Sequence, residues 1–266
     1  MILAATLPGG TLNQDRHATG DGFALVLDGA TSFAGDRSHD PGWYAEQLAN
    51  ALTVTVPDGG TLADAATAAI ANVRDAHGLT PDTAPTSTIA LARWSAETVE
   101  TYVLGDSLAV VLHPDGTETV HHDDRLAAVA PAERAAYRAH LADGHGYDDA
   151  LRPLLLALQA EQARHRNQPG GFWIAGAQPE AAQHGVTTTT PRRDVAAVML
   201  ATDGVALDRH PTATTWRDLY DEARHDGPAQ VLQRIHDAEV SDPDGQRWPR
   251  AKPHDDKTLV VITPGD

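Results

Sequence analysis

Short apolar runs bounded by glycine, proline or aspartate recur along the chain. Residues 23–27 (FALVL) lie between Gly22 and the pair Asp28-Gly29, a pattern that predicts a buried strand ending in a turn. Residues 195–200 (VAAVML) and 258–262 (TLVVI) have the same character and predict two more buried strands. All three runs are therefore expected to lie in the interior of the protein.

The segment 88–120 shows a different pattern, in which strand-like runs follow one another closely. Residues 95–97 and 114–116 are short connections of the kind that join antiparallel strands. They predict an antiparallel meander made of the runs 88–94, 99–104, 108–112 and 117–120. Two later strands are expected at 172–175 and 186–190.

Helical segments are expected between these groups of strands. Asp40 is a favourable N-cap and Pro41 suits the first helical position, so a helix should run from there to about residue 52. Thr61 similarly caps an alanine-rich segment that reaches about residue 76. Further helices are expected at about 131–141, 147–166, 215–224 and 228–240. Strands and helices thus occur in blocks, which predicts an α+β fold rather than βαβ alternation.

Composition narrows the class of protein. The chain has 266 residues, 41% of them hydrophobic and 21% charged, which is globular composition. Length alone allows two small domains, but we expect a single domain over 1–266. The net charge of −17 argues against nucleic acid as a partner.

The location is predicted from what the sequence lacks. No apolar run approaches the roughly 20 residues of a membrane helix, and the start of the chain has no signal-peptide pattern. We therefore expect no membrane association and a cytoplasmic location. The chain has no cysteine, which excludes disulfides, thiolate metal ligands and a cysteine nucleophile.

Three aspartates stand at the ends of predicted strands. Asp28 follows residues 23–27, Asp203 comes shortly after 195–200, and Asp255 comes shortly before 258–262. If the last strand runs antiparallel to the other two, its start lies beside the ends of the others, and the three carboxylates converge. Such oxygen-rich clusters suit Mg²⁺ or Mn²⁺ rather than Zn²⁺. A single Asp-Gly pair is first of all a turn signal, so the combination matters more than any one of them.

A series of motifs in order extends this interpretation. The segments are NQDR (13–16), LVLDGAT (25–31), TST (86–88), LGDSLAVVL (104–112), MLATDGV (199–205) and HDDKTLVVI (254–262). This series resembles the metal-dependent protein serine/threonine phosphatases of the 2C type, and it spans nearly the whole chain. The resemblance implies two packed antiparallel β-sheets flanked by α-helices, with a metal pair at one end.

The resemblance also implies the metal ligands. Asp28 matches the aspartate that bridges two metals, and Gly29 matches the glycine whose backbone carbonyl binds one of them. Asp203 and Asp255 match the other carboxylate ligands, and Asp106 matches an aspartate that can hold a weaker third metal. The expected cofactors are two or three Mn²⁺ or Mg²⁺ ions.

The implied reaction is direct attack of water on phosphorus. Asp15 matches an acidic residue that orients the attacking water, so the expected catalytic residues are Asp15, Asp28, Asp203 and Asp255. Gln14 stands where many members of the family have glutamate. His254, next to Asp255, is a further candidate proton donor.

The substrate side departs from the family pattern. Gly10 stands where the family usually has an arginine that grips the substrate phosphate. Arg16 and Arg37 are the candidates to replace it.

Three functions are consistent with this pattern. The first is a phosphatase for phosphoserine or phosphothreonine in proteins. The second is a phosphatase for a phosphorylated small molecule or peptide, which the missing arginine would favour. The third is a catalytically weak regulatory or binding module on the same fold. Retention of the metal carboxylates argues against the third, because a scaffold gains little from clustered negative charge.

Overall fold

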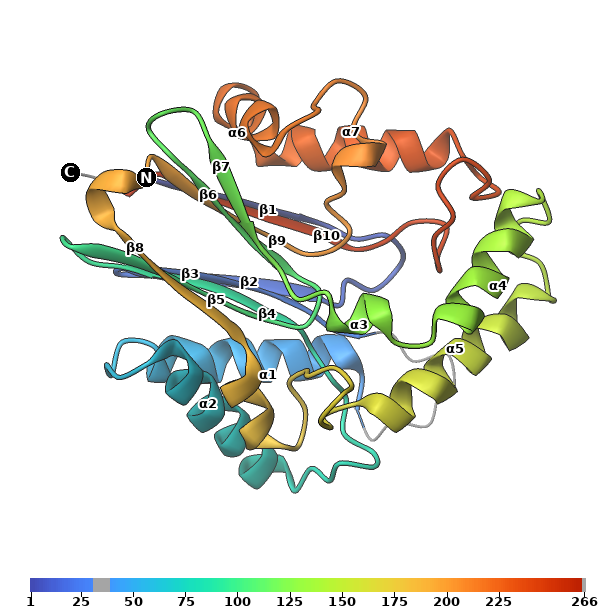
Figure 1. Cartoon of the computed structure of the whole chain (residues 1–266), viewed down its shortest axis with the longest axis horizontal. Helices are drawn as coiled ribbons and strands as arrows, with labels where there is room; N and C mark the ends of the chain where they lie inside the picture. Colours follow the sequence, from blue (N-terminus) through green and yellow to red (C-terminus); the bar gives the residue numbers. More distant parts are fainter. Residues whose placement is uncertain (31–38, 265–266) are drawn as a thin grey trace.

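The computed structural model describes residues 1–30 and 39–264 and shows two five-stranded antiparallel sheets packed face to face (Figure 1). The first sheet has the strand order β1-β10-β9-β6-β7, with β1 at Ile2–Leu7, β10 at Lys257–Ile262, β9 at Ala197–Ala201, β6 at Leu108–Leu112 and β7 at Glu118–His121. The second has the order β2-β3-β4-β5-β8, with β2 at Asp15–Gly20, β3 at Phe23–Asp28, β4 at Ile89–Trp94, β5 at Thr98–Leu104 and β8 at Val186–Pro191.

Helices cover the outer faces of both sheets. In Figure 1, α6 (Trp216–His225) and α7 (Pro228–Val240) lie over the first sheet, and α1 (Pro41–Thr55) and α2 (Leu62–His77) lie over the second. A further group stands beyond one end of the sandwich, where α4 and α5 form a pair. Its helices are α3 (Arg125–Ala128), α4 (Pro131–Ala142) and α5 (Leu151–His165). Short 3₁₀ helices occur at Pro179–His184, Arg192–Asp194 and Leu207–Arg209.

This layering explains why several strands are apolar along their whole length. Val26 and Val103 of the second sheet belong to the same buried cluster as Leu200 and Val260 of the first. The alternate residues of these strands face the helices, as Leu25 does toward α1 and α2 and Met199 toward α6 and α7. A strand covered on both faces has no solvent side, so it cannot alternate between polar and apolar residues.

The α+β fold with two packed antiparallel sheets is confirmed, as are the starts of the first two helices. The Asp40 carboxylate accepts hydrogen bonds from the backbone N–H groups of Gly42 and Trp43, which fixes the start of α1. Thr61 accepts from the Asp64 N–H and caps α2 in the same way.

Two parts of the predicted strand pattern are wrong. The four runs in 88–120 do not form one meander: β4 and β5 pair in the second sheet, whereas β6 and β7 pair in the first. The chain crosses between the sheets at Gly105, whose φ of 83° belongs to the left-handed region that glycine adopts without strain. Residues 172–175 form only isolated bridges, and β1 and β2 were not expected.

The strand directions place the ends of β3 and β9 and the starts of β2, β6 and β10 at one end of the sandwich. Ala201, at the end of β9, pairs with Leu259 near the start of β10 and with Leu108 at the start of β6. In the second sheet Asp15, at the start of β2, pairs with Asp28 at the end of β3. This end of the sandwich is the one that faces α4 and α5 in Figure 1.

The interior between the sheets should be sensitive to lost volume. Leu200 has no exposed surface, so Leu200→Ala should lower the free energy of unfolding by about 2–5 kcal/mol through lost burial and the cavity left behind. Urea unfolding followed by circular dichroism measures this change. Val54→Ala, at a side chain that is 65% exposed, is the control and should change stability by less than about 0.5 kcal/mol. Equal effects of the two substitutions would contradict the layered core.

Candidate metal centre

Four carboxylates line one cavity at this end of the sandwich. Asp28 ends β3, Asp106 lies in the crossing between β5 and β6, Asp203 follows β9, and Asp255 precedes β10. The cavity has a volume of about 330 Å³. Asp28 belongs to the second sheet and the other strand ends to the first, so the carboxylates converge across the two sheets.

Three of these carboxylates, those of Asp28, Asp106 and Asp203, have raised pKa values. Burial raises the pKa of Asp28 well above its usual range, and the charges of Asp15, Asp203 and Asp255 raise it further. Burial, Asp203 and Asp255 together raise the pKa of Asp106 to about 7. The pKa of Asp203 is also raised, by its enclosure in the cavity and by Asp255, although a hydrogen bond with Asp28 partly offsets the rise. Clustered acidic oxygens that repel one another are a suitable environment for a divalent cation, which would neutralise them.

Asp15 lies behind this cluster and is almost completely buried. Its Oδ2 accepts a hydrogen bond of 2.8 Å from the hydroxyl of Thr202, which in turn accepts one from the Thr258 N–H. Its Oδ1 is buried and accepts no hydrogen bond from the described residues. Burial, with the charges of Asp256 and Asp203, raises the pKa of Asp15 to about 7 despite the threonine hydrogen bonds. A buried carboxylate oxygen without a donor fits a site that holds a water molecule or cation.

The Asp28 backbone is fixed by polar groups of the neighbouring chain. Its N–H donates to the hydroxyl of Thr88 at 3.0 Å, and that hydroxyl also lies 2.5 Å from the hydroxyl of Ser107. The next residue, Gly29, is closely surrounded: a Cβ there would lie 2.7 Å from the backbone of Pro41. This close approach explains why glycine follows Asp28.

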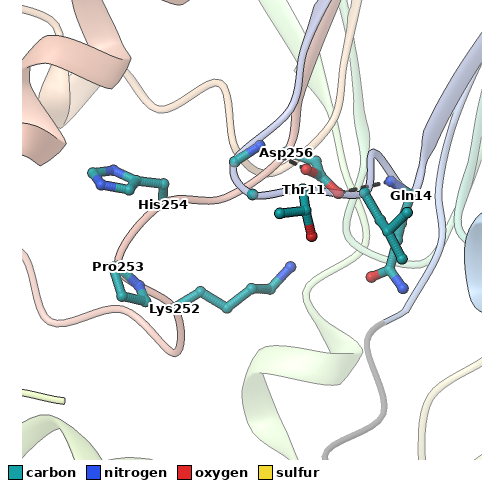
Figure 2. A pocket seen from close by; sticks show the side chains of 9 residues that line it. Thr11, Gln14, Lys252, Pro253, His254 and Asp256 are labelled. Atoms are coloured by element: carbon teal, nitrogen blue, oxygen red, sulfur yellow. Dashed lines mark hydrogen bonds between the residues drawn. The ribbon is translucent and has the colours of Figure 1, made fainter.

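Asp256 is a structural residue that the sequence did not single out. Its carboxylate accepts hydrogen bonds from the N–H groups of Gly9 at 2.7 Å and Gln14 at 2.8 Å, as drawn for Gln14 in Figure 2. It thereby ties the connection between β1 and β2 to the start of β10. The only sequence signal is the Asp-Asp pair. It does not reveal that Asp255 lines the cavity whereas Asp256 binds the backbone of the β1–β2 connection.

Lys252 is a second residue that sequence analysis missed. Its Nζ lies 2.6 Å from Oδ1 of Asp255. Burial alone would lower the pKa of this amine, but Asp255, Asp28 and Asp203 together hold it above its usual value. Lys252 therefore stays positively charged beside the carboxylates.

Of the two arginines predicted to bind substrate, Arg16 is not brought to this cavity. The Arg16 guanidinium donates to the backbone carbonyls of Asn13 and Asp15 at 2.7 Å each and lies 3.6 Å from Glu46. Arg16 is not among the residues lining the carboxylate cavity. Arg37 lies outside the described residues. Their role in substrate binding remains a prediction.

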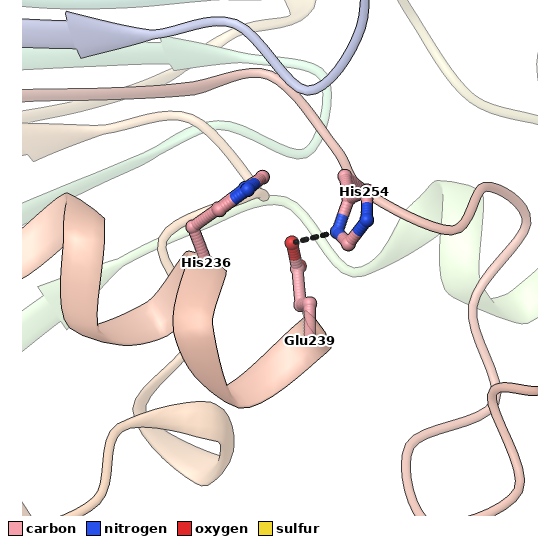
Figure 3. Close-up of side chains that lie close together, drawn as sticks. All are labelled: His236, Glu239 and His254. Carbon is pink, nitrogen blue, oxygen red and sulfur yellow. Dashed lines mark ion pairs between the residues drawn. The ribbon is translucent and has the colours of Figure 1, made fainter. Parts of the chain in front are cut away.

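His254 belongs to a different cluster, shown in Figure 3 with His236 and Glu239 of α7. A set of two histidines and one carboxylate resembles a metal site. However, the buried Glu239 already pairs with the ammonium of Lys257 at 2.6 Å and with the Arg209 guanidinium. Two cations neutralise the single carboxylate, so we interpret this cluster as an ion network behind Asp255.

The fold and the carboxylate-lined cavity define a metal-dependent hydrolase of phosphoesters. A model of the protein phosphatase 2C family matches residues 5–241, and the chain belongs to that family. The match ends before Asp255. No curated protein matches the chain by sequence.

Solved bacterial phosphatases share the fold. Serine/threonine phosphatase Stp1 from Staphylococcus aureus is 11% identical, with a TM-score of 0.60 over 100% of this chain and 95% of that one. The Mycobacterium tuberculosis phosphatase PstP/Ppp is 17% identical, with a TM-score of 0.56 over 98% and 97%. The catalytic domain of PstP in complex with two manganese ions is 15% identical, with a TM-score of 0.56 over 98% and 96%.

The raised pKa values predict how stability depends on pH when metal is removed. Asp15 and Asp106 titrate near pH 7 in the folded chain and near 4 when unfolded, so the folded state binds more protons between these values. In EDTA, their contribution should reduce the free energy of unfolding as pH rises from 5 to 8. Urea unfolding at the two pH values measures this, and Mg²⁺ should restore stability at pH 8.

The variant Asp15→Asn/Asp106→Asn isolates these groups from the histidines that titrate in the same range. The free energy of unfolding of the native chain minus that of this variant should decrease as the pH rises from 5 to 8. A difference that rises with pH would contradict the raised pKa values.

Proposed function

We propose that the chain hydrolyses phosphoserine and phosphothreonine in proteins, using Mn²⁺ or Mg²⁺ held by Asp28, Asp203 and Asp255. The observation that carries the proposal is the meeting of four carboxylates in one cavity, with the pKa of Asp28, Asp106 and Asp203 raised by enclosure and mutual repulsion. A surface used only for binding would have no need for so much unfavourable charge in one place.

The residues fit a pair of hard divalent cations. Carboxylate oxygens from three strand ends, together with the Gly29 carbonyl, form the oxygen-only set that Mg²⁺ and Mn²⁺ prefer. Asp106 shares the cavity with Asp203 and is the candidate ligand for a third, weaker ion. The PstP catalytic domain in complex with two manganese ions has the same fold, which supports two ions here. Bound divalent cations would lower the pKa of a water molecule and offset charge on the phosphoryl group.

Asp15 is proposed to orient the attacking water. The Thr202 hydroxyl holds one carboxylate oxygen, and the buried second oxygen is left to accept a hydrogen bond. A residue with a pKa of about 7 can also take up a proton at neutral pH. Asp15 and Asp28 lie on paired strands in direct register, so the backbone fixes the distance between these two carboxylates.

The helices at the end of the sandwich complete the cavity. Tyr137 and Arg138 of α4 and Leu158 and Gln162 of α5 form its outer wall. This wall encloses the carboxylates on the side away from the sheets and limits access of bulk water. A phosphorylated side chain that extends from a peptide would enter between this wall and the strand ends.

The remaining expectations form part of the proposal. We treat residues 1–266 as a single domain, acting in the cytoplasm on phosphoproteins without a nucleic-acid partner. None of the described helices is both long and apolar enough to cross a membrane. Among the functions considered, membership in the protein phosphatase 2C family favours a protein substrate over a small molecule or a purely regulatory module.

Hydrolysis of p-nitrophenyl phosphate tests the proposed reaction. Turnover should require Mn²⁺ or Mg²⁺, be lost in EDTA, and return on addition of the metal. Asp203→Asn removes a charged ligand and should reduce kcat/KM by at least about 100-fold, a loss of roughly 2.7 kcal/mol of transition-state stabilisation. Asp208→Asn, at a nearby residue outside the carboxylate cavity, is the matched control and should keep its activity. Metal-independent turnover, or full activity of Asp203→Asn, would refute the two-metal mechanism.

A panel of phosphorylated substrates tests the substrate class. Phosphoserine and phosphothreonine peptides should be hydrolysed with a higher kcat/KM than the same sequences carrying phosphotyrosine and than phosphorylated sugars. Released phosphate measures each rate. Preference for a small phosphorylated metabolite would favour the alternative substrate and leave the reaction type unchanged.

A further inference from the structure

Five cationic side chains line the carboxylate cavity, and three of them are already engaged. Arg209 pairs with Glu239, and Arg250 pairs with Asp242 at 2.8 Å while donating to four backbone carbonyls nearby. Arg134 donates to the backbone carbonyl of Leu126 at 2.9 Å. These contacts engage the three guanidinium groups with residues outside the carboxylate cluster. Among the described cations of this cavity, the side chains of Lys252 and Arg138 donate no hydrogen bond outside the cluster.

Of these two, Lys252 has the closer relation to the carboxylates. Its ammonium lies 2.6 Å from Oδ1 of Asp255, whereas Arg138 is an exposed residue of α4 whose guanidinium lies 6.0 Å from the centre of the Tyr137 ring. The Asp256 N–H also donates to Oδ1 of Asp255, at 3.0 Å. Oδ1 thus has two donors, which leaves Oδ2 as the oxygen for a cation. Lys252 can therefore keep its contact with Asp255 while its other N–H groups point elsewhere.

The position of Lys252 connects two cavities. Besides the carboxylate cavity it lines a second one, formed by the connection between β1 and β2 and by residues around His254. In the view of Figure 2 the Lys252 side chain extends beneath Thr11 toward Gln14. Its side chain is 27% exposed, so part of it is accessible to solvent.

Gly10 also lines this second cavity. A Cβ at Gly10 would meet no atom within 4 Å, so residue 10 contributes neither charge nor bulk here. Lys252 is one of only two lysines in the chain, and the other, Lys257, is completely buried against Glu239. The positive charge at this cavity therefore comes from the segment before β10 and not from the segment after β1.

We propose that Lys252 is the residue that binds the phosphoryl oxygens of the substrate. The proposal rests on the phosphatase function proposed above and names its phosphate-binding cation. Anchored to Asp255 on one side, the ammonium presents its remaining N–H groups to an anion at the edge of the carboxylate cluster. Because a lysine makes single and not bidentate contacts, it should bind a monoester through charge more than through geometry.

Steady-state kinetics with p-nitrophenyl phosphate and saturating Mn²⁺ tests this role. Lys252→Met removes the charge but keeps an unbranched side chain, and it should raise KM and the inhibition constant of inorganic phosphate by ~10- to 100-fold. The change in kcat should be smaller. Lys252→Arg should recover most of the affinity. Arg193→Met, at a side chain that is 84% exposed and does not line the carboxylate cavity, is the control and should change both constants by less than about threefold.

Metal affinity separates phosphate binding from a role in positioning Asp255. By calorimetry, Lys252→Met should bind Mn²⁺ at least as tightly as the native chain, because a positive charge near the metal ligands has been removed. Weaker Mn²⁺ binding, with unchanged phosphate inhibition, would overturn the proposal and make Lys252 a positioning residue. A large effect of Arg138→Met with none of Lys252→Met would also overturn it.

A direct readout of the amine does not depend on turnover. Reductive methylation with ¹³C-formaldehyde labels lysines and the N-terminal amine, so few NMR signals arise, and Lys252→Arg identifies the one from Lys252. With Mg²⁺ bound, inorganic phosphate should shift this signal with the same apparent Kd as its inhibition constant. An unmoved Lys252 signal would refute the proposal even in an active phosphatase. A shifted signal in a protein without turnover would retain phosphate binding and sink the hydrolase function alone.

Discussion

Mutual repulsion among the carboxylates at one end of the sandwich is the constraint on which the rest of the structure depends. Asp28, Asp106 and Asp203 have raised pKa values, and Asp15 stands buried behind them with one unpaired oxygen. Such an arrangement costs stability, and two rigid sheets maintain it because their strand ends are fixed by long antiparallel ladders. Divalent cations would neutralise the same repelling carboxylates. The clustering that lowers the stability of the metal-free fold is therefore also what enables the site to bind catalytic metal ions.

The positively charged side chains around the carboxylate cluster are of two kinds: those that pair with acidic residues outside the cluster, and Lys252, which pairs with Asp255. Arg209 and Lys257 neutralise Glu239, and Arg250 pairs with Asp242, so these cations stabilise the loops that carry Asp203 and Asp255. Among the described cations, only Lys252 forms an ion pair with one of the proposed metal ligands, and its side chain is partly exposed. Structural cations and substrate-facing cations can thus be distinguished by the groups to which their N–H groups already donate. The acidic net charge of the chain does not prevent a local site for an anion, because binding depends on the nearest groups.

Much of the fold could be predicted, since both its strands and its helix starts have local signals. Apolar runs such as 23–27 and 258–262 identify strands covered on both faces, and Asp40 and Thr61 cap their helices through contacts within three residues. The prediction failed where pairing is decided at long range. β5 and β6 are separated by only three residues yet lie in different sheets, and β1 pairs with β10 from the other end of the chain. No local pattern distinguishes a hairpin from a crossing that uses Gly105.

The same division holds for the candidate site. By itself the sequence determined the residues that stand at strand ends, including Asp28, Asp203 and Asp255, because an aspartate directly beside a buried run has to lie at a rim. Only the tertiary structure decided that these carboxylates meet across two sheets, that Asp256 holds the β1–β2 connection, and that Lys252 faces the cavity while Arg16 pairs elsewhere. The physical reason is that the partner of a long polar side chain depends on which distant backbone lies within its reach, and that distance is set by the packing of the whole sandwich.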